Sequence, residues 1–503
     1  MDNLIFGILT VILCAIGYYY SWIFQKRDNF KIALLLIILC GLALRIYTAS
    51  DFFVHTWDER YHALVAKNLI QHPLTPTLYD NPVLPYDYKD WTANHIWLHK
   101  QPLPLWTMAS SMWLFGINEI ALRLPSVLLT TIGIWLTFLI ASFFFDKKVG
   151  YLAAFFYSVN GLIIELTGGR VATDHIDIFF LFFIELSIYF SIVFAQKQKL
   201  IYNVLAGASL GAAILSKWLP ALIVLPIWLL VITNSTNLKP VQVAIHFFIL
   251  IATCTLIFLP WQLYIFKTFP VEANWESLYN FKHFTDELEE RTGPFYYFIN
   301  RIRIDYGELI YLPLFWFSWQ TIKNLKDKKR LAIFIWFMIP FLFFSLAETK
   351  MKAYILFTGP ALFIMTAEFW HVLFAYRINH KLRWFINLIL ILFIALPLRY
   401  TIERTKPFSQ SDRSPQWVTE LKNLNSKNII NGILLNYDRP IEAMFYTNLT
   451  VYPGIPEKKL IEELVAKGYN VIINDNGTIP IDIKSMNGVT TENLTASNHI
   501  RNF

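Results

Sequence analysis

Two apolar runs near the start of the chain decide its fold class: LIFGILTVILCAIGYYYSWIF at residues 4–24 and KIALLLIILCGLALRIYTA at residues 31–49. A helix rises about 1.5 Å per residue, so about 20 apolar residues cross the ~30 Å hydrocarbon core of a bilayer. Backbone polar groups find no water there, so a spanning run must pair its own N–H and C=O groups in a helix. Both runs are therefore predicted to be transmembrane helices.

Apolar runs of similar length recur along the chain. Of its 503 residues, 55% are hydrophobic and only 16% are charged, and the mean hydropathy is +0.44. Soluble domains carry about 25% charged residues. Further candidate spans lie near 121–144, 149–166, 172–194, 201–217, 218–234, 241–264, 306–321, 331–347, 353–372 and 384–400. We expect an all-α polytopic membrane protein with about 12 transmembrane helices.

Basic residues in the short loops predict the orientation. Every odd-numbered span is followed by lysine or arginine: Lys26 and Arg27, Lys147 and Lys148, Lys197 and Lys199, Lys239, Lys323 to Arg330, and Arg377 to Arg383. The positive-inside rule places such loops in the cytoplasm. Both termini and the long segments 50–120, 265–305 and 401–503 are then expected outside. The net charge of +7 reflects this topology, and we expect no nucleic-acid partner.

The long outer segments carry predicted structure of their own. Segment 50–120 contains helical patterns at 59–71 and 103–115, which we expect to lie flat on the membrane. The tail alternates strand-length apolar runs with helical patterns, which predicts a small α/β domain. Its expected strands are 429–435, 450–452 and 471–473, and its expected helices are 415–424, 440–446 and 457–468. We expect a transmembrane domain over 1–404 and an extracytoplasmic domain over 405–503.

Clusters of polar residues lie at the outer ends of the spans. The first, His55-Thr-Trp-Asp-Glu-Arg-Tyr-His62, follows the second span. Asp58 has the chemistry to cap the helix that follows, and equally to take a proton from an acceptor at the membrane surface. Spacing alone leaves both interpretations open.

The second cluster is His95-Ile-Trp-Leu-His-Lys-Gln-Pro102. Lys100 suits a phosphate as a point charge, although a lysine that snorkels from an interfacial helix gives the same pattern. His95 and His99 have the i,i+4 spacing of a helical metal pair, but no glutamate completes such a motif and Pro102 follows at once. The three cysteines all lie inside apolar runs, where they form neither a disulfide framework nor a metal pattern.

The third cluster, Gly168-Gly-Arg-Val-Ala-Thr-Asp-His-Ile-Asp177, joins two spans. Asp174 and Asp177 lie three residues apart, and two carboxylates entering hydrocarbon are costly unless they face a polar cavity. We therefore favour a functional role for them, with Arg170 nearby, although Thr173 or Asp174 is also suited to cap the helix.

Further cations lie at outer helix ends. Lys217 sits between two apolar runs, and Lys350 and Lys352 precede Tyr354. Each is explained by snorkelling or by contact with an anionic ligand. The topology brings these cations and the carboxylates to one side of the membrane. We expect one pocket there, open sideways to the bilayer, in which cations hold a phosphate leaving group and a carboxylate acts as general base.

In their order, these motifs resemble the type C glycosyltransferases. The closest resemblance is to the bacterial branch related to protein O-mannosyltransferases and to the aminoarabinose transferase that modifies lipid A. The family's Asp-Glu…Arg-Tyr is matched with one residue fewer before the arginine, and its Thr-Lys-Gly-type turn has tryptophan in place of glycine. The matching residues are Asp58 to Tyr61, His99 to Leu103, Trp106, Arg123 to Ser126, Thr173-Asp174, Ser216 to Trp218, and Lys350, Tyr354 and Pro360, and the similarity spans roughly 30–375.

The resemblance implies an inverting transfer of a hexose or pentose from a polyprenyl-phosphate donor, without a nucleotide sugar, at a bacterial cytoplasmic membrane. It makes Asp58 the base and places Asp174 on the acceptor side. The implied ligands of the donor phosphate are Lys100, Arg60, Lys217 and Lys350, and the other pocket candidates are Glu59, His99, Arg170, Asp177, Lys352 and Tyr354. No cofactor is certain. Some relatives bind a divalent metal near these carboxylates and others do not, which leaves a metal at Asp58 open. Lipid A, a protein or another glycan remains open as the acceptor.

Two other functions share these features. A transporter or flippase of lipid-linked sugars would also be polytopic, but it often shows inverted repeats and charges near the bilayer midplane, and neither is evident in the sequence. A polymerase or ligase of surface polysaccharide would also use lipid-linked donors and long outer loops. The ordered motifs favour the glycosyltransferase.

Overall fold

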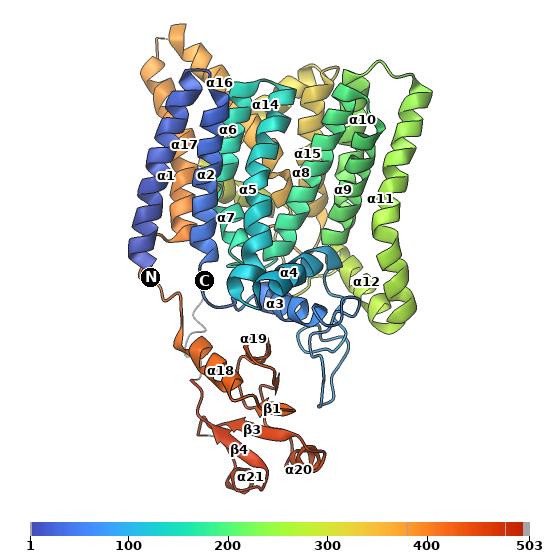
Figure 1. Ribbon diagram of the computed structural model, residues 1–503. Coiled ribbons are helices and arrows are strands. Elements are labelled where there is room, and N and C mark those ends of the chain that lie inside the picture. Colours follow the sequence, from blue (N-terminus) through green and yellow to red (C-terminus); the bar gives the residue numbers. More distant parts are fainter. Residues whose placement is uncertain (1–2, 380, 478, 496–503) are drawn as a thin grey trace. The chain divides into compact units, whose positions relative to one another are not determined.

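The structure, a computed structural model, describes residues 3–379, 381–477 and 479–495, and it divides into two compact units that interleave along the chain (Figure 1). The first unit comprises Met1–Ala49, Leu98–Pro104 and Arg123–Gln410. The second comprises Ser50–Trp97, Leu105–Leu122 and Ser411–Phe503. The long first outer loop and the tail therefore belong to one unit, although nearly the whole helical bundle separates them in sequence.

The first unit is a bundle of helices. Its α-helices are α1 (Asn3–Lys26), α2 (Phe30–Ala49), α5 (Glu119–Phe144, whose first turn belongs to the second unit), α6 (Lys147–Ser158), α7 (Gly161–Thr167), α8 (Asp174–Lys197), α9 (Leu200–Lys217), α10 (Val224–Ser235), α11 (Pro240–Thr268), α12 (Pro270–Thr285), α13 (Tyr297–Tyr306), α14 (Tyr311–Lys323), α15 (Lys328–Leu346), α16 (Gly359–Tyr376) and α17 (Arg383–Thr405). Short 3-10 turns are η1 (Leu219–Ile223), η2 (Glu308–Ile310), η3 (Leu356–Thr358) and η4 (Arg377–Asn379).

The helices of this bundle agree with the predicted spans. Within the described residues, nine helices are long and apolar enough to cross a membrane, and the bent pair α6–α7 makes up to ten. The segment Leu219–Ser235 is a shorter apolar helix. Each of the predicted runs coincides with helical structure, which confirms the polytopic all-α prediction. Large apolar side chains such as Phe248 and Leu256 on α11 are exposed, as expected for a surface in contact with lipid.

One predicted span differs in detail. The run 149–166, expected as a single helix, is broken into α6 and α7, which meet at an angle of 51°. Asn160 accounts for the break, because its side-chain oxygen accepts a hydrogen bond from the backbone N–H of Ile163 and so caps a new helix. The residue that caps the start of α7 therefore also marks the end of α6.

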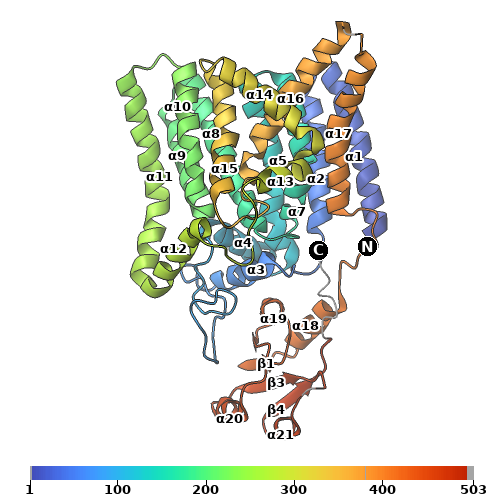
Figure 2. The same ribbon diagram turned by 180° about the vertical axis from the view of Figure 1, so that it is seen from behind.

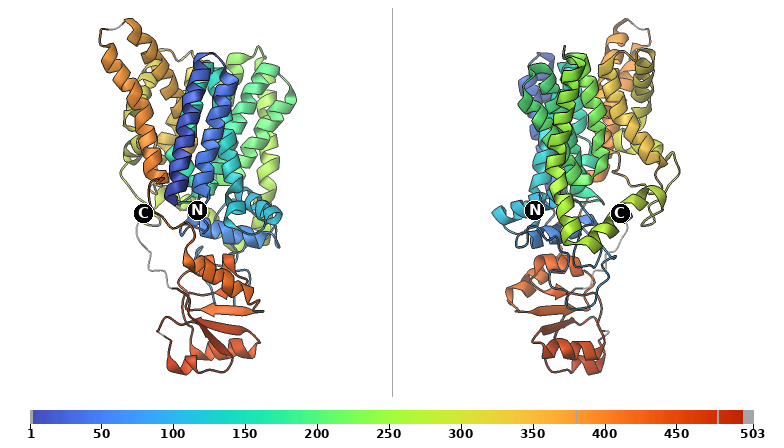
Figure 3. Two further views of the ribbon diagram at one scale, coloured as in Figure 1. Left: turned by 60° about the vertical axis from the view of Figure 1, so that its left-hand side comes forward. Right: turned by 90° about the vertical axis from the view of Figure 1, so that its right-hand side faces the viewer.

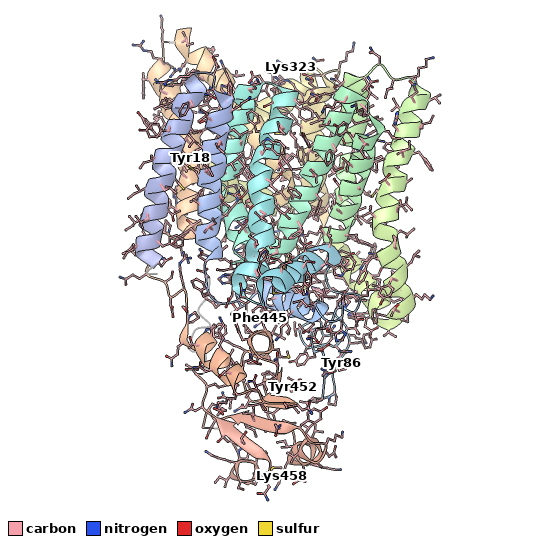
Figure 4. All side chains as sticks on the ribbon, viewed as in Figure 1. Tyr18, Tyr86, Lys323, Phe445, Tyr452 and Lys458 are labelled. Carbon is pink, nitrogen blue, oxygen red and sulfur yellow. The ribbon has the colours of Figure 1, made fainter. Side chains whose placement is uncertain are left out.

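The core of the bundle places particular helices side by side. Helix α8 packs against α9 and α10, α9 packs against α11, and α6 packs against α16. In Figures 1 and 2, α12 lies at the end of the bundle where α1 begins and α17 ends. Lys323, labelled in Figure 4, lies at the opposite end. The first unit thus has one end with the predicted basic loops and another with α12.

The second unit contains the helices predicted for the first outer loop and the predicted α/β tail. Helices α3 (Asp58–Leu69) and α4 (Pro102–Phe115, whose first turn belongs to the first unit) lie where helical patterns were expected. The tail elements are α18 (Gln416–Ser426), β1 (Gly432–Leu435), α19 (Pro440–Tyr446), β2 (Thr450–Val451), α20 (Lys458–Ala466), β3 (Asn470–Asn474), α21 (Ile481–Lys484) and β4 (Val489–Glu492). The strand β4 was not predicted, because its sequence is short and mostly polar.

The tail forms a parallel four-stranded sheet in the order β2-β1-β3-β4. Alternate side chains point to opposite faces of a strand. Leu434 and Ile472 pack with α18 and α19, whereas Ile433 and Val471 pack with α20 and α21. Both faces of the sheet are therefore covered by helices, as the views in Figure 3 show. Gly468, at φ 85°, follows the end of α20, where glycine suits a positive φ.

The tail shares a hydrophobic core with the first outer loop. Buried residues of α3 and α4 form one cluster with buried residues of α18, α19 and β1. The Tyr452 hydroxyl, labelled in Figure 4, accepts hydrogen bonds from the backbone N–H groups of Val83 and Leu84. The Tyr79 ring stacks on Tyr452 at 5.2 Å. The second unit is therefore built jointly from two distant parts of the sequence.

Candidate functional site

A group of titratable side chains surrounds Lys100 in the first unit. Lys100 is half-buried in the short segment before α4, and it acts electrostatically on Asp177, Glu276 and His283. Among the described residues, none hydrogen-bonds to or forms an ion pair with the Lys100 ammonium. Together with Lys217, these residues are called the Lys100 cluster below. Its central cation is available for an anionic ligand.

Lys217 contributes a second cation to the Lys100 cluster. It ends α9, and its ammonium forms an ion pair with the buried Asp177 carboxylate in the first turn of α8. The same ammonium lies 4.9 Å from the centre of the Tyr354 ring, where a cation is attracted by the face of the aromatic ring. The sequence predicted Asp177, Lys217 and Tyr354 as pocket residues, and the structure brings these three together.

Helix α12 supplies the carboxyl group that sequence analysis missed. The Glu276 Oε2 atom lies 3.4 Å from Nδ1 of His99, and both side chains are less than a tenth exposed. Burial raises the pKa of Glu276 to about 7, although Lys100 and His283 favour its charged form. Burial likewise lowers the pKa of His283. Near neutral pH the Lys100 cluster therefore carries more positive than negative charge, which suits a phosphate.

Two non-glycine residues beside the Lys100 cluster have strained backbones. Thr173, which precedes α8, has φ 63°, and Trp218, which follows α9, has φ 80° and ψ −156°. The second conformation is essentially restricted to glycine, and such strain gathers at functional sites. Trp218 is also the position where the family pattern has glycine. The backbone just before the first turn of α8, which carries Asp177, and just after Lys217 is thus held in a conformation that costs free energy.

Asp174 lies at the first position of α8 and is fully buried. Its carboxylate accepts a hydrogen bond from the backbone N–H of His175. The His175 ring is in turn held by Ser126, with 2.7 Å between Nδ1 and Oγ. Arg123 of the same Arg-Leu-Pro-Ser motif donates a hydrogen bond to the carbonyl of Ala49 at the end of α2. Ser126 thus fixes the start of α8, and Arg123 connects the same motif to the end of α2.

The loop before η3 is paired with the last turn of α12 and with the segment that follows it. The backbone N–H of Lys350 donates to the carbonyl of Arg291 at 2.8 Å, and that of Thr349 donates to His283 at 3.1 Å. The Lys350 ammonium is buried and hydrogen-bonds to the carbonyl of Ala347 at 2.5 Å. Lys350 therefore closes its own loop in this structure, and its role at a donor phosphate stays a prediction.

A second charged network occupies the same end of the bundle. Arg404 of α17 forms ion pairs with Glu165 of α7 at 2.5 Å and with Asp305 of α13 at 2.6 Å. Lys352 acts electrostatically on Asp305, whose pKa is raised by burial. Arg170 donates to the carbonyl of Thr405. Arg170 and Lys352 were predicted as pocket residues, whereas the three residues at the centre of this network were not.

The residues around Asp58 belong to the second unit. Asp58 is half-buried and begins α3, and the N-cap position is occupied by Trp57. The Glu59 carboxylate accepts a hydrogen bond from the backbone N–H of His55 at 2.7 Å. Arg60 forms an ion pair with Glu442 of the tail at 3.3 Å. The convergence of Asp58 with the Lys100 cluster, and the phosphate-binding role of Arg60, stay predictions.

Known proteins resemble this chain in sequence. Residues 99–264, about a third of the chain, match the family described as dolichyl-phosphate-mannose-protein mannosyltransferase. An uncharacterised protein of Aquifex aeolicus is 27% identical over 67% of this chain and 63% of its own length. The undecaprenyl phosphate-alpha-4-amino-4-deoxy-L-arabinose arabinosyl transferase 2 of Proteus mirabilis is 21% identical over 67% of this chain and 59% of its own length. The chain thus spans about three fifths of the length of these curated relatives.

Solved structures match over more of the chain. ArnT from Cupriavidus metallidurans bound to undecaprenyl phosphate superimposes with a TM-score of 0.61 at 15% identity, covering 86% of this chain and 87% of ArnT. The oligosaccharyltransferase AglB from Archaeoglobus fulgidus, in complex with an inhibitory peptide and a dolichol-phosphate, gives a TM-score of 0.57 at 14% identity, covering 86% of this chain and 65% of AglB. This chain has the type C glycosyltransferase fold.

The Lys100 cluster falls largely within the part of the type C fold that matches the mannosyltransferase family. Lys100, Asp177 and Lys217 all lie between residues 99 and 264. Glu276 lies beyond the matched segment, and Asp58 lies before it. The described residues include no group of three or more histidine, cysteine, aspartate or glutamate side chains placed to hold a metal ion.

Proposed function

We propose that this protein transfers a sugar, a hexose or a pentose, from a polyprenyl-phosphate donor to an acceptor at the outer face of the cytoplasmic membrane. The observation that carries this proposal is the half-buried Lys100 ammonium, which has no ionic partner of its own among the described residues. A second lysine, Lys217, lies in the same cluster. Fixed cations in a partly desolvated site stabilise a phosphate most strongly when it leaves with additional charge.

The reaction that fits these residues is a single displacement with inversion. The acceptor oxygen attacks the anomeric carbon, the bond from that carbon to the phosphate oxygen breaks, and its electron pair leaves with the polyprenyl phosphate. Asp58 takes the proton of the acceptor hydroxyl, while Asp174 shapes the acceptor side. Lys100 and Lys217 neutralise the charge that develops on the phosphate. The resemblance to transferases of aminoarabinose and mannose supports this assignment.

The orientation follows from the charge of the loops. Lysine-rich loops such as the one after α14 lie at the end of the bundle opposite to α12. The positive-inside rule then places the Lys100 cluster, both chain termini and the tail outside the cytoplasm. The donor would reach the cluster laterally, because its polyprenyl chain stays in lipid. Lipid A, a protein or another glycan serves as the acceptor.

The test uses the full-length protein in detergent with undecaprenyl phosphate as the probe. A ligand that binds only the folded state raises its stability by mass action. We expect undecaprenyl phosphate to raise the Tm of the wild type, but not that of Lys100→Met. The matched control is Lys323→Ala, at the other end of the bundle, which should keep the full shift. An equal shift in Lys100→Met would exclude Lys100 as the phosphate ligand.

Activity is tested with radiolabelled undecaprenyl-phosphate aminoarabinose and bacterial lipid extract. The wild type should release undecaprenyl phosphate and label the acceptor, and Lys100→Met should lose about 100-fold or more of kcat/KM. Asp58→Asn should bind undecaprenyl phosphate as the wild type does but transfer no sugar. Intact donor that crosses the bilayer of reconstituted vesicles, with its sugar still attached, would instead identify a flippase.

A further inference from the structure

The helix that begins with Asp58 and Glu59 is joined to the tail by a buried ion pair. Nη1 of Arg60 lies 3.3 Å from Oε1 of Glu442, and the Glu442 side chain is 0% exposed whereas that of Arg60 is 26% exposed. Nη2 of Arg60 donates to the Tyr61 hydroxyl at 3.0 Å. Because an isolated carboxylate is very costly to bury, Glu442 depends on Arg60 for compensation.

A lysine on the same face of α3 holds the other end of α19. Lys67 follows Arg60 by seven residues, a spacing that returns a side chain to the same helix face. Its ammonium donates to the carbonyls of Met444, Phe445 and Thr447 at 2.7, 3.1 and 2.6 Å. These are carbonyls at the C-terminal end of α19, where a cation is favoured. Arg60 and Lys67 of α3 thus contact the first and the last turn of α19.

The segment that leads into α3 is also held by the tail. Asp51 forms an ion pair with Arg413 at 3.2 Å, and both side chains are buried. The backbone N–H of Val54 donates to the Tyr446 hydroxyl at 2.9 Å. That hydroxyl donates in turn to the Glu119 carboxylate at 2.7 Å. The tail therefore contacts the chain on both sides of Asp58.

We propose that the α/β tail is a positioning domain for α3, in which Glu442 acts through Arg60, and the end of α19 acts through Lys67, to fix the helix that carries Asp58 and Glu59. Arg60 is then a docking residue, and Glu442 a positioning residue that does not touch the substrate. The catalytic consequence rests on the proposed sugar transfer, whereas the docking itself does not.

Hydrogen–deuterium exchange on the full-length protein tests the docking. In Glu442→Gln, which keeps the size of the side chain but removes its charge, the amides of residues 55–69 should exchange at least about ten-fold faster than in the wild type. Lys67→Met should do the same and serves as a second variant if Glu442→Gln does not fold. The control is Asp482→Asn, which breaks the exposed Lys458–Asp482 pair in the same domain and should leave residues 55–69 unchanged.

A charge exchange tests the pair itself. Arg60→Glu and Glu442→Arg should each accelerate exchange in α3, and the double variant should restore protection to within about three-fold of the wild type, because contacting residues couple in a double-mutant cycle. If Glu442→Gln and Lys67→Met both fold and exchange as the wild type does, the proposal is overturned. Failure of the double variant to recover, when both single variants fold, overturns the pairing.

Binding and turnover separate positioning from phosphate contact. Glu442→Gln should lower kcat by at least about five-fold, while the Tm shift caused by undecaprenyl phosphate stays that of the wild type. Loss of that shift in Arg60→Gln, with Glu442→Gln unaffected, would make Arg60 a phosphate ligand and contradict the proposal. If the wild type transfers no sugar at all, the exchange data still decide whether the tail holds α3.

Discussion

Glu276 is a single buried carboxyl group whose protonation sets the charge around Lys100. Its pKa of about 7 means that it is neutral below pH 7 and negative above it. The ionised form attracts the Lys100 ammonium and competes with an incoming phosphate. We expect the KM for a polyprenyl-phosphate donor to rise about five-fold as the pH increases through 7.

Glu276→Gln measures this effect directly. The donor is a phosphodiester that does not titrate near neutrality, so a change in KM reports on the protein. The glutamine variant should show a KM that is independent of pH between 6 and 8 and equal to that of the wild type at low pH. A variant that keeps the wild-type pH profile would show that another group controls donor binding.

The burial of this carboxyl also affects stability. Because the folded protein binds the Glu276 proton more tightly than the unfolded chain does, stability falls as the pH rises from the ordinary glutamate pKa through about 7. The upper end of this window, near pH 7, lies within the physiological range.

At the residue scale, charged residues next to apolar runs and in polar clusters were predicted from the sequence, whereas several of their distant partners were not. Asp177 and Lys217 stood out because charges are rare within apolar runs, and Lys100 stood out as a point charge suited to a phosphate. Glu276 gave no such signal, since it lies on the polar helix α12, and its partner His99 is 177 positions away. Glu442 is separated from Arg60 by 382 positions. Long-range pairs of this kind leave no local trace in one sequence.

At the scale of elements, the close approach of α7 and α2 rests on Gly168. A Cβ at this position would lie 2.8 Å from the carbonyl oxygen of Thr48, which is backbone and unable to move aside. Gly168→Ala should therefore lower the free energy of unfolding by about 1–3 kcal/mol through overpacking, seen as a lower Tm in detergent. Gly454→Ala, where nothing lies within 4 Å of the new Cβ, is the matched control and should show little change.

The elements themselves were largely predictable. The length and hydropathy of the runs predicted the spans, because a helix pairs all of its own backbone N–H and C=O groups in lipid. The break at Asn160 was missed, since apolar residues continue on both sides of it. Strand β4 was missed because a polar edge strand has no hydrophobic alternation to reveal it.

For the whole molecule, Arg404 links three distant parts of the bundle. It joins α7, α13 and α17 through Glu165 and Asp305. Arg404→Met removes the positive charge that pairs with both carboxylates. The Glu165 carboxylate then loses this ion pair, and Asp305 keeps Arg301, whose Nε lies 3.2 Å from its carboxylate. We expect the free energy of unfolding to fall by ~3–5 kcal/mol, as measured by unfolding in detergent. The control Arg399→Met, on the same helix but exposed, should unfold close to the wild type.

If Arg404→Met unfolds at the same temperature as Arg399→Met, the network does not stabilise the bundle. Asp305→Asn is a further check. It leaves Arg404 paired with one carboxylate, so it should lower the free energy of unfolding by less than Arg404→Met does.

The global arrangement was predicted in outline. Topology and motif order indicated the type C fold, and the alternation of short runs indicated an α/β tail. The joint unit formed by the first outer loop and the tail was not foreseen, because the apolar faces of α3 and α19 each look like ordinary amphipathic surfaces until their partner is known.

This joint unit imposes an order on biogenesis. About 290 residues separate the first outer loop from the tail that completes its core. At ~5–20 residues per second, α18 and α19 are synthesised roughly 15–60 s after the first outer loop that contains α3 and α4. During that interval their apolar sides are uncovered, so chaperones or the lipid surface must shield them. Premature termination before residue 411 would leave a bundle that inserts normally but displays an unfinished, aggregation-prone loop.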